Sequence, residues 1–288
     1  MSDKVISQVD RDGNATVMLN RPEVHNAFDP EMVEALTSTL TKLATNSKVR
    51  AVIVLGAGMN FCAGADIAHM KRSATFSREQ NFKAAQQTAR MLYTLYTLKK
   101  PTIACVRGAV RGGGVGLVAA CDIAIASREA TFRLSEVKLG IIPAMISPYV
   151  IAAIGERYAH RYMLSGEEFD VAEAFRIGLV HDIVEAEALN ATVGRMLAHL
   201  YSSGPNALVA IKQLIPVSTR ATIDHAIVDE TARRIAEVRA TPEAQEGLSA
   251  FLEKRKPAWI APASQKKQKG VNRQDAKGAK KSNAKDER

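Results

Sequence analysis

The chain has 288 residues, of which 47% are hydrophobic and 24% are charged, and its formal net charge is +9. This composition is that of an ordinary globular protein. No stretch approaches the roughly 18 apolar residues of a spanning helix, and the first residues lack the apolar core of a signal peptide. The cysteines Cys62, Cys105 and Cys121 lie in apolar or small-residue surroundings, which predicts buried thiols and not a disulfide framework or a nucleophile. We therefore expect a reduced, cytoplasmic protein.

The C-terminal segment carries most of the positive charge. Residues 264–288 contain nine Lys or Arg and three Asp or Glu, so they contribute +6 and leave about +3 for the rest of the chain. With one valine and no aromatic residue, this segment cannot bury enough apolar surface to offset its chain entropy. We predict a disordered basic tail over 261–288. A protein that ends at Ala263 should keep its turnover and its melting temperature. The alternative is an RNA-binding arm, which a steep salt dependence would reveal.

The remaining chain alternates between strand and helix patterns before it becomes helical throughout. A helix begins at Pro30 with Asp29 as its N-cap. This alternation predicts an α/β core over 1–200, followed by an α-helical region over 201–260. The turn residues Asp12-Gly13-Asn14 predict two short strands around them, at 5–9 and 16–19, and apolar runs predict buried strands at 49–55, 101–106 and 122–126. Further helices are predicted at about 78–98, 115–120, 144–154, 157–164, 170–176, 186–202, 205–215, 220–238 and 242–254.

Two glycine-rich segments, 61–67 and 107–116, each follow a buried strand and precede a helix. Small side chains there allow a ligand to approach the main chain, and a helix N-terminus leaves free N–H donors. One donor from each segment, converging on a single oxygen, would bind an oxyanion. The alternative is a pair of close-packed strand–helix turns. Residues 114–119 also match a dinucleotide fingerprint, but the preceding strand ends too early and the helix is too short.

Seven motifs resemble, in order and in spacing, those of the enoyl-CoA hydratase/isomerase (crotonase) family. The resemblance covers about residues 5–260. It implies a right-handed spiral of ββα turns followed by a helical region, assembled as a homotrimer or as a homohexamer built from two trimers. The motifs are Leu19-Asn20-Arg21-Pro22, Asn26-Ala27-Phe28, Ala63-Gly64-Ala65-Asp66-Ile67, Gly112-Gly113-Gly114, the segment 120–126, the segment 132–143, and Phe251 to Pro257.

The same resemblance implies a site for an acyl-CoA substrate. The N–H groups of Ala65 and Gly113 would hold the thioester oxygen. Ala68 stands where many relatives have a lysine near CoA, so one phosphate contact is missing. No cofactor is implied, and the six histidines lack metal-ligand spacing. The residues expected along the bound CoA are Ala63, Gly64, Asp66, Ile67, Arg111 and Lys256; Arg111 and Arg107 could instead bind a second substrate carboxylate or be plain surface charges.

The acid/base group of the implied site is Glu136, and its departure from the family pattern is at Gly116. Well-studied hydratases hold water between two glutamates, but Gly116 stands at the position of the first. Glu136 alone can serve a hydratase through one water or an isomerase by moving a proton between carbons. Without the resemblance, Glu136 would read as a capping residue. Replacing Gly116 with Glu would restore the two-carboxylate pattern.

The segment that follows Pro143 favours a hydratase. Residues 142–150 resemble bacterial methylglutaconyl-CoA hydratase-like members of leucine and acyclic-terpene degradation. The expected function is therefore an enoyl-CoA hydratase for a branched or dicarboxylic acyl chain, with an isomerase as the alternative. Nucleic-acid binding is not expected as the principal function, because no recognised module and no interleaved aromatic residues are present.

Overall fold

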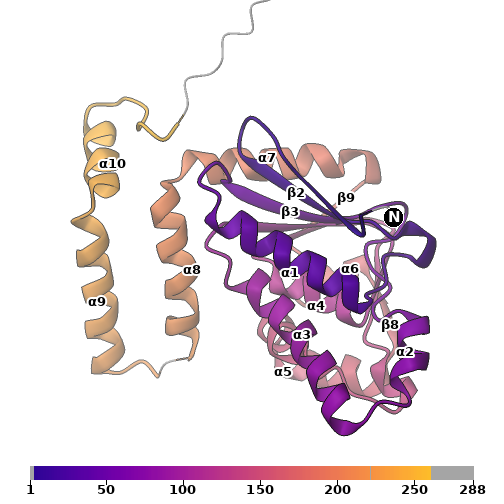
Figure 1. The fold of residues 1–288 in the computed structure, drawn as a ribbon. Coiled ribbons are helices and arrows are strands. Elements are labelled where there is room, and N and C mark those ends of the chain that lie inside the picture. Colours follow the sequence, from indigo (N-terminus) through magenta and orange to yellow (C-terminus); the bar gives the residue numbers. More distant parts are fainter. Residues whose placement is uncertain (1–2, 221, 261–288) are drawn as a thin grey trace, which may run out of the picture.

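The computed structural model describes residues 3–220 and 222–260 of the chain. The basic tail predicted for 261–288 lies outside the described residues. The main sheet has six strands in the order β1-β2-β3-β4-β6-β9, and all neighbours are parallel except the antiparallel pair β1 and β2 (Figure 1). Its strands are β1 (Val5–Val9), β2 (Asn14–Leu19), β3 (Ala51–Gly56), β4 (Thr102–Val106), β6 (Ile123–Ser127) and β9 (Asp182–Val184).

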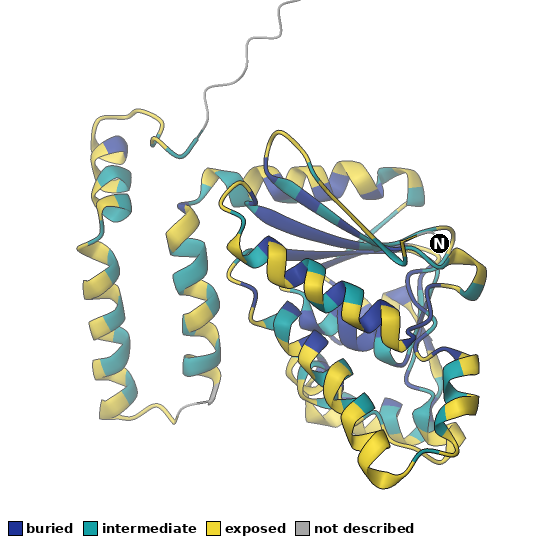
Figure 2. Cartoon of the chain, viewed as in Figure 1, coloured by how far each residue is buried: buried dark blue, intermediate teal, exposed yellow. Residues whose placement is uncertain are grey.

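The central strands of this sheet are buried on both faces, which explains their unbroken apolar sequences. Val52 and Val54 of β3 join the larger core, whereas Ala51 and Ile53 face a smaller one. The larger core is covered by α1 (Pro30–Thr45), α3 (Arg78–Tyr96) and α4 (Gly113–Ala120), and the smaller one by α7 (Leu189–Ser202). Figure 2 shows the strands and the inward helix faces as the buried part of the molecule.

A second, smaller sheet aligns the glycine-rich segments. It consists of β5 (Ala109–Arg111), β7 (Thr131–Arg133) and β8 (Glu168–Asp170), with β5 and β7 parallel. Single bridges continue the ladder from Val110 to Cys62 and from Ala65 to Phe28. Segments far apart in the sequence thereby become neighbours. The sequence patterns did not predict these short strands.

The connecting helices differ from the predicted ones at α2 (Ile67–Ser73), at the 3₁₀ turn η2 (Glu136–Leu139) and at α5 (Ser147–Ser165). Helix α2 and the turn η2 were not predicted, and each follows a segment of the small sheet. The two helices expected at 144–154 and 157–164 form one element, α5, which is interrupted at Gly155 by a φ of 74°. The remaining short elements are η1 (Pro22–Val24), α6 (Val171–Arg176) and η3 (Ala186–Ala188).

The C-terminal helices form an arm that projects from the body (Figure 1). The arm contains α8 (Pro205–Arg220), α9 (His225–Arg239) and α10 (Pro242–Leu252), so it begins just after α7 ends at Ser202. Lys212 ties α8 to the body by donating to Asp122 at 2.6 Å and to the Lys100 carbonyl at 3.0 Å. Over the described ranges, no helix combines the length and the apolar character needed to cross a lipid bilayer.

Candidate active site

A cavity of about 400 Å³ lies where the small sheet meets α2, α3 and the start of α5. It brings together residues of both glycine-rich segments and Glu136. A larger, more open depression of about 1050 Å³ lies between the β1–β2 turn and α7, and contains neither glycine-rich segment. The smaller cavity is lined by Phe28, Asp29, Pro30, Val33, Ala63, Gly64, Ala65, His69, Met70, Ser73, Asn81, Ala84, Ala85, Gln87, Thr88, Gly112, Gly113, Ser135, Glu136, Leu139, Ile141, Ile142, Pro143, Met145 and Ile146.

The Ala65 N–H is left free by the way its segment pairs with Phe28. The Phe28 N–H donates to the Gly64 carbonyl at 2.7 Å, and the Asp66 N–H donates to the Phe28 carbonyl at 2.8 Å. Because alternate residues of an extended segment face opposite sides, the Ala65 N–H points away from Phe28. In the part of the chain that is described, this N–H donates to no protein group. Ala65 itself is exposed to the cavity.

The second donor belongs to Gly113, the first residue of α4. A helix leaves its first N–H groups without a carbonyl one turn earlier, and the Gly113 N–H is free among the described residues. The two segments touch, because a Cβ on Gly64 would lie 3.6 Å from the Gly113 nitrogen and 2.9 Å from the Arg111 carbonyl oxygen. Two free donors from adjoining segments therefore line one cavity, as an oxyanion site requires.

The Glu136 carboxyl lies beside these donors. A Cβ on Gly112, the residue before Gly113, would lie 2.9 Å from Glu136 Oε1, so only glycine leaves the carboxyl room. Glu136 Oε2 is buried and has no hydrogen-bond partner among the described residues. Burial raises the pKa of Glu136, because a dry environment disfavours the charged form. A simple capping role does not account for a carboxyl that is buried and unpaired in a cavity.

Gly116 does not line the cavity, and the structure corrects the expectation that glutamate would fit there. Gly116 is buried in α4, and a Cβ on it would overlap Ile146 Cγ2 and lie 2.7 Å from Ile146 Cβ. Real Cβ atoms essentially never approach other atoms this closely. A glutamate at residue 116 therefore requires Ile146 to move, and a single substitution cannot restore the two-carboxylate pattern.

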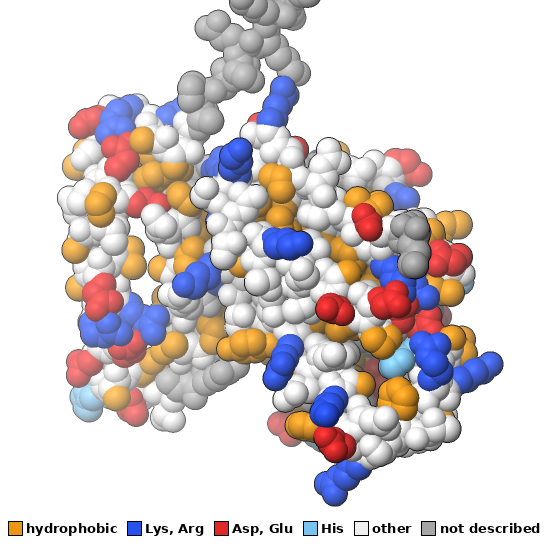
Figure 3. All heavy atoms as spheres, in the orientation of Figure 1, with side chains coloured by type: hydrophobic (Ala, Val, Ile, Leu, Met, Phe, Trp, Pro, Cys, Tyr) orange, Lys and Arg blue, Asp and Glu red, His pale blue; other side chains and the backbone are white. Residues whose placement is uncertain are grey.

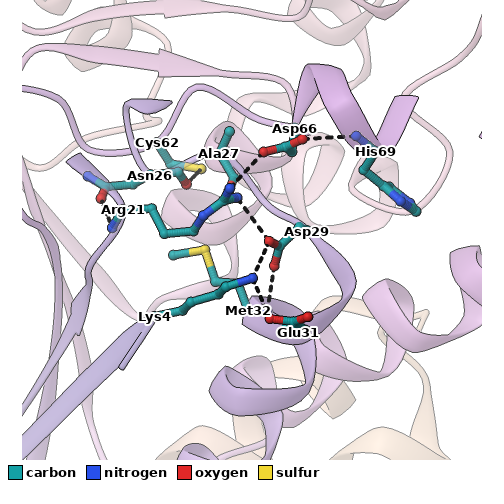
Figure 4. Close-up of polar contacts among 10 residues, drawn as sticks. All are labelled: Lys4, Arg21, Asn26, Ala27, Asp29, Glu31, Met32, Cys62, Asp66 and His69. Atoms are coloured by element: carbon teal, nitrogen blue, oxygen red, sulfur yellow. Dashed lines mark hydrogen bonds and ion pairs between the residues drawn. The ribbon is translucent and has the colours of Figure 1, made fainter. Parts of the chain in front are cut away.

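The other acid of the lining, Asp29, is already engaged (Figure 4). It caps α1 through the Met32 N–H and accepts from Lys4 at 2.5 Å, while Arg21 lies 3.3 Å away. Burial alone would raise the pKa of Asp29, but the hydrogen bond and charge of Lys4 hold it below the usual value. Asp29 therefore stays ionised, which makes it unsuited to giving up and taking back a proton near neutral pH.

The residues expected along CoA are only partly brought together. Ala63 and Gly64 line the cavity, and Ile67 is exposed beside it. The buried Asp66 carboxylate caps α2 by accepting the His69 N–H and pairs with Arg21 at 2.9 Å, so it is not free for a ligand. Its pKa is low because these two bonds outweigh the effect of burial.

The basic residues expected at the site lie outside the cavity of this chain. Arg111 donates to the Thr131 carbonyl at 2.8 Å and to Glu168 at 2.5 Å, within the small sheet. Arg107 donates to the Ala186 carbonyl. Lys256 follows α10 on the arm. The arginines thus have structural partners, and no lysine or arginine is found among the cavity-lining residues described.

Sequence reasoning missed the side of the cavity that α3 forms. Helix α3 contributes Asn81, Ala84, Ala85 and Thr88, whose three- and four-residue spacing marks one helix face and was the available signal. Ile146 lies in the segment 142–150, which the sequence marked by its resemblance to other family members but not as part of a cavity wall. Cys62 and Cys105 are buried as predicted, whereas Cys121 is half-buried. Desolvation raises the pKa of Cys62 and of Cys121 to about 12 and that of Cys105 to about 11, so none of the three is a thiolate at neutral pH. The described residues contain no cluster of side chains able to hold a metal ion.

Comparison with known proteins decides the family. The family model described as enoyl-CoA hydratase/isomerase matches residues 10–262. The chain belongs to this family. It is 33% identical over 244 residues to the short-chain-enoyl-CoA hydratase of Clostridium acetobutylicum, covering 84% of this chain and 92% of that protein.

Solved structures of enoyl-CoA hydratases share the fold. The enoyl-CoA hydratase of Shewanella pealeana is 40% identical with a TM-score of 0.86, covering 89% of this chain and 96% of that one. Pseudomonas aeruginosa AtuE is 36% identical with a TM-score of 0.85, covering 90% of this chain and 100% of that one. The predicted crotonase-like α/β fold with a helical C-terminal region is thereby confirmed, and the protein is an enzyme of the enoyl-CoA hydratase/isomerase type.

Proposed function

We propose that this enzyme is an enoyl-CoA hydratase in which Glu136 is the single acid/base group. The observation that carries the proposal is the position of its carboxyl, whose Oε2 is buried and unpaired among the described residues, beside the segment that bears the free Gly113 N–H. Family members named as hydratases support the reaction type. Acyl-CoA is the substrate, and no further cofactor takes part.

Hydration proceeds through an enolate. The thioester oxygen accepts the Ala65 and Gly113 N–H groups while a water oxygen attacks the β-carbon. The electrons of the double bond move through the α-carbon onto the thioester oxygen. Glu136 takes the proton that the water loses. Glu136 then delivers a proton to the α-carbon, which regenerates the thioester. Each N–H donor contributes about 2.7–4 kcal/mol to the transition state, and proton transfer contributes about 10²–10⁴-fold.

The acyl chain is short and branched. The inner cavity combines aliphatic residues such as Val33, Met70 and Ile146 with the uncharged polar residues Ser73 and Thr88. Since the cavity-lining residues described include no Lys or Arg, a second substrate carboxylate would be desolvated without an ionic partner from this chain. The lining thus favours an uncharged acyl chain over the dicarboxylic methylglutaconyl chain.

Isomerisation is the second candidate, and the exclusion of a side chain at Gly116 favours it. With one carboxylate, Glu136 can remove a proton from the α-carbon of a 3-enoyl-CoA, which gives a dienolate held by the same two N–H groups, and return the proton to the γ-carbon. The two reactions differ in the position of the double bond in the substrate and in whether a water adds to it.

Substrate assays with a matched variant test both candidates. Crotonyl-CoA, 3-methylcrotonyl-CoA and 3-methylglutaconyl-CoA are followed by the loss of enoyl-thioester absorbance, and a 3-enoyl-CoA by its gain. Glu136→Gln is expected to lower kcat by about 10² or more with little change in CoA affinity, because CoA is held elsewhere. Near-normal turnover of this variant on every thioester would move the acid/base group away from Glu136. Turnover of the 3-enoyl-CoA alone would select the isomerase.

A further inference from the structure

Gly116 and Ile146 form one packed contact between two elements of the core. Gly116 lies within α4, and Ile146 is the 2% exposed residue just before α5. A Cβ on Gly116 would overlap Ile146 Cγ2, and would lie 2.7 Å from Ile146 Cβ but 3.6 Å from Ile146 Cα. The last distance is ordinary van der Waals contact. Only glycine at residue 146 therefore leaves room for a side chain at residue 116.

The same isoleucine lines the cavity that contains Glu136. It stands there with Ile142 and Met145, so the wall on this side of the cavity is aliphatic. The glycine within α4 and the isoleucine just before α5 are thus a single packing feature. The aliphatic side chain fills the space that a side chain from residue 116 would enter.

We propose that Ile146 is a specificity-determining residue that occupies the place of a second carboxylate. Its side chain keeps this wall of the cavity apolar, so that the attacking water is held by Glu136 alone. The proposal rests on the function proposed above. It implies that exchanging the two positions, with glutamate at 116 and glycine at 146, creates a site with two carboxylates.

The packing half of the proposal is tested without any assay of function. Gly116→Ala adds only a Cβ, and overpacking of this kind lowers Tm by roughly 2–10 °C. In the Ile146→Gly background, Gly116→Ala should not lower Tm, because the side chain that obstructs the new Cβ is gone. Ile146→Ala is the matched control: it leaves the Cβ at 2.7 Å and should not relieve Gly116→Ala. Equal Tm effects of Gly116→Ala in all three backgrounds would overturn the proposal.

The chemical half uses the same three backgrounds with Gly116→Glu. Hydration of crotonyl-CoA by Gly116→Glu/Ile146→Gly should exceed that by Ile146→Gly tenfold or more, whereas Gly116→Glu alone and Gly116→Glu/Ile146→Ala should show no gain. A gain in the single variant, or none in the exchange variant that recovers its Tm, would contradict the proposal. If the wild type hydrates no thioester while the Tm pattern holds and the exchange variant becomes a hydratase, the proposed function fails but the role of Ile146 stands.

Discussion

The Glu136 carboxylate lowers the stability of the fold, and the same burial gives it the raised pKa that its proposed acid/base role needs. Its carboxyl is buried in the cavity wall, and Oε2 has no hydrogen-bond partner among the described residues. An ionised carboxylate in such surroundings is held at a cost, which is the physical reason for its raised pKa. The same raised pKa suits a group that must both take and give a proton near neutral pH.

The first prediction concerns stability and pH. A carboxyl whose pKa is raised by folding stabilises the protein fully below its unfolded pKa of about 4.3, and this stabilisation is lost as pH rises through the folded pKa. Glu136→Gln should therefore raise Tm at pH 7 while it removes activity, and the gain should vanish near pH 4. Calorimetry from pH 4 to pH 8 checks this, with the exposed Glu129→Gln as control. A lower Tm at pH 7 for Glu136→Gln would contradict the desolvation argument.

Gly113 offers a second prediction at this scale. Two variants distinguish the effect of losing its N–H donor from the effect of adding a side chain: proline does both, whereas alanine only adds a Cβ. Gly113→Pro removes the donor and should lower kcat/KM by about 10²–10³, the usual cost of one oxyanion donor. Gly113→Ala keeps the N–H but adds the same Cβ, which would lie 3.0 Å from the Phe28 ring. It should therefore retain far more activity than the proline variant.

CoA affinity and melting curves serve as controls for both Gly113 variants. The oxyanion assignment would be wrong if Gly113→Pro stayed within tenfold of the wild type. It would also be wrong if alanine and proline were equally damaging, because packing would then explain the loss.

Between elements, Arg21 joins the caps of two helices that flank the cavity. It donates to Asp66, the N-cap of α2, and lies 3.3 Å from Asp29, the N-cap of α1 (Figure 4). It also donates to the Ala27 carbonyl at 2.7 Å. Ala65, whose N–H is free among the described residues, directly precedes Asp66 and pairs with Phe28, the residue before Asp29. We therefore expect Arg21 to hold the proposed oxyanion site in position without lining the cavity itself.

The third prediction follows from the burial of this network. The Asp66 side chain is 7% exposed and that of Arg21 is 14% exposed, so Arg21→Met leaves a buried carboxylate without its cation. The free energy of unfolding should fall by about 3 kcal/mol, and kcat should fall together with it. Arg21→Lys should recover part of both.

Urea unfolding and steady-state kinetics measure the Arg21 effects. The matched control is Arg128→Met, which breaks the exposed Arg128–Glu185 pair and should cost less than about 1 kcal/mol with no effect on kcat. A similar small cost for Arg21→Met would show that the Arg21 network adds little to the fold.

At the scale of the whole molecule, the arm is the feature that a single chain leaves unexplained. Its helices carry large apolar side chains that remain exposed, and Figure 3 shows hydrophobic side chains over its surface. Apolar groups arranged in this way normally meet another protein surface. These exposed residues are Ile211, Ile215, Val228, Ile235, Leu248, Phe251 and Leu252.

The fourth prediction is that the enzyme assembles as trimers, either as one trimer or as a pair. Light scattering at micromolar concentration should return three or six times the 31.2 kDa of the chain. Replacing Phe251 and Leu252, which are 82% and 77% exposed, by Asp should weaken the assembly without unfolding the body. A single 31.2 kDa species for the wild type would rule out the trimer.

The sequence by itself determined the features that depend on local patterning. Continuous apolar runs predicted β3, β4 and β6, because a strand buried on both faces needs no alternation. The turn residues Asp12-Gly13-Asn14 predicted β1 and β2 on either side of them. Asp29 and Pro30 marked the start of α1 as the structure has it. Glycine-rich segments ahead of helices indicated free main-chain donors, and the ordered motifs identified the family. These features need only neighbouring residues to be recognised.

The tertiary structure alone decided what depends on contacts between distant segments. The three-residue strands β5, β7 and β8 are too short to show a pattern, and they exist because they pair with one another. Asp66 and Arg111 looked available for a ligand, yet partners 45 and 57 residues away engage them. Gly116 looked like room for a second carboxylate, but Ile146 fills that space. Packing of this kind leaves no periodic signal, because its partners are set by the fold and not by their spacing in the chain.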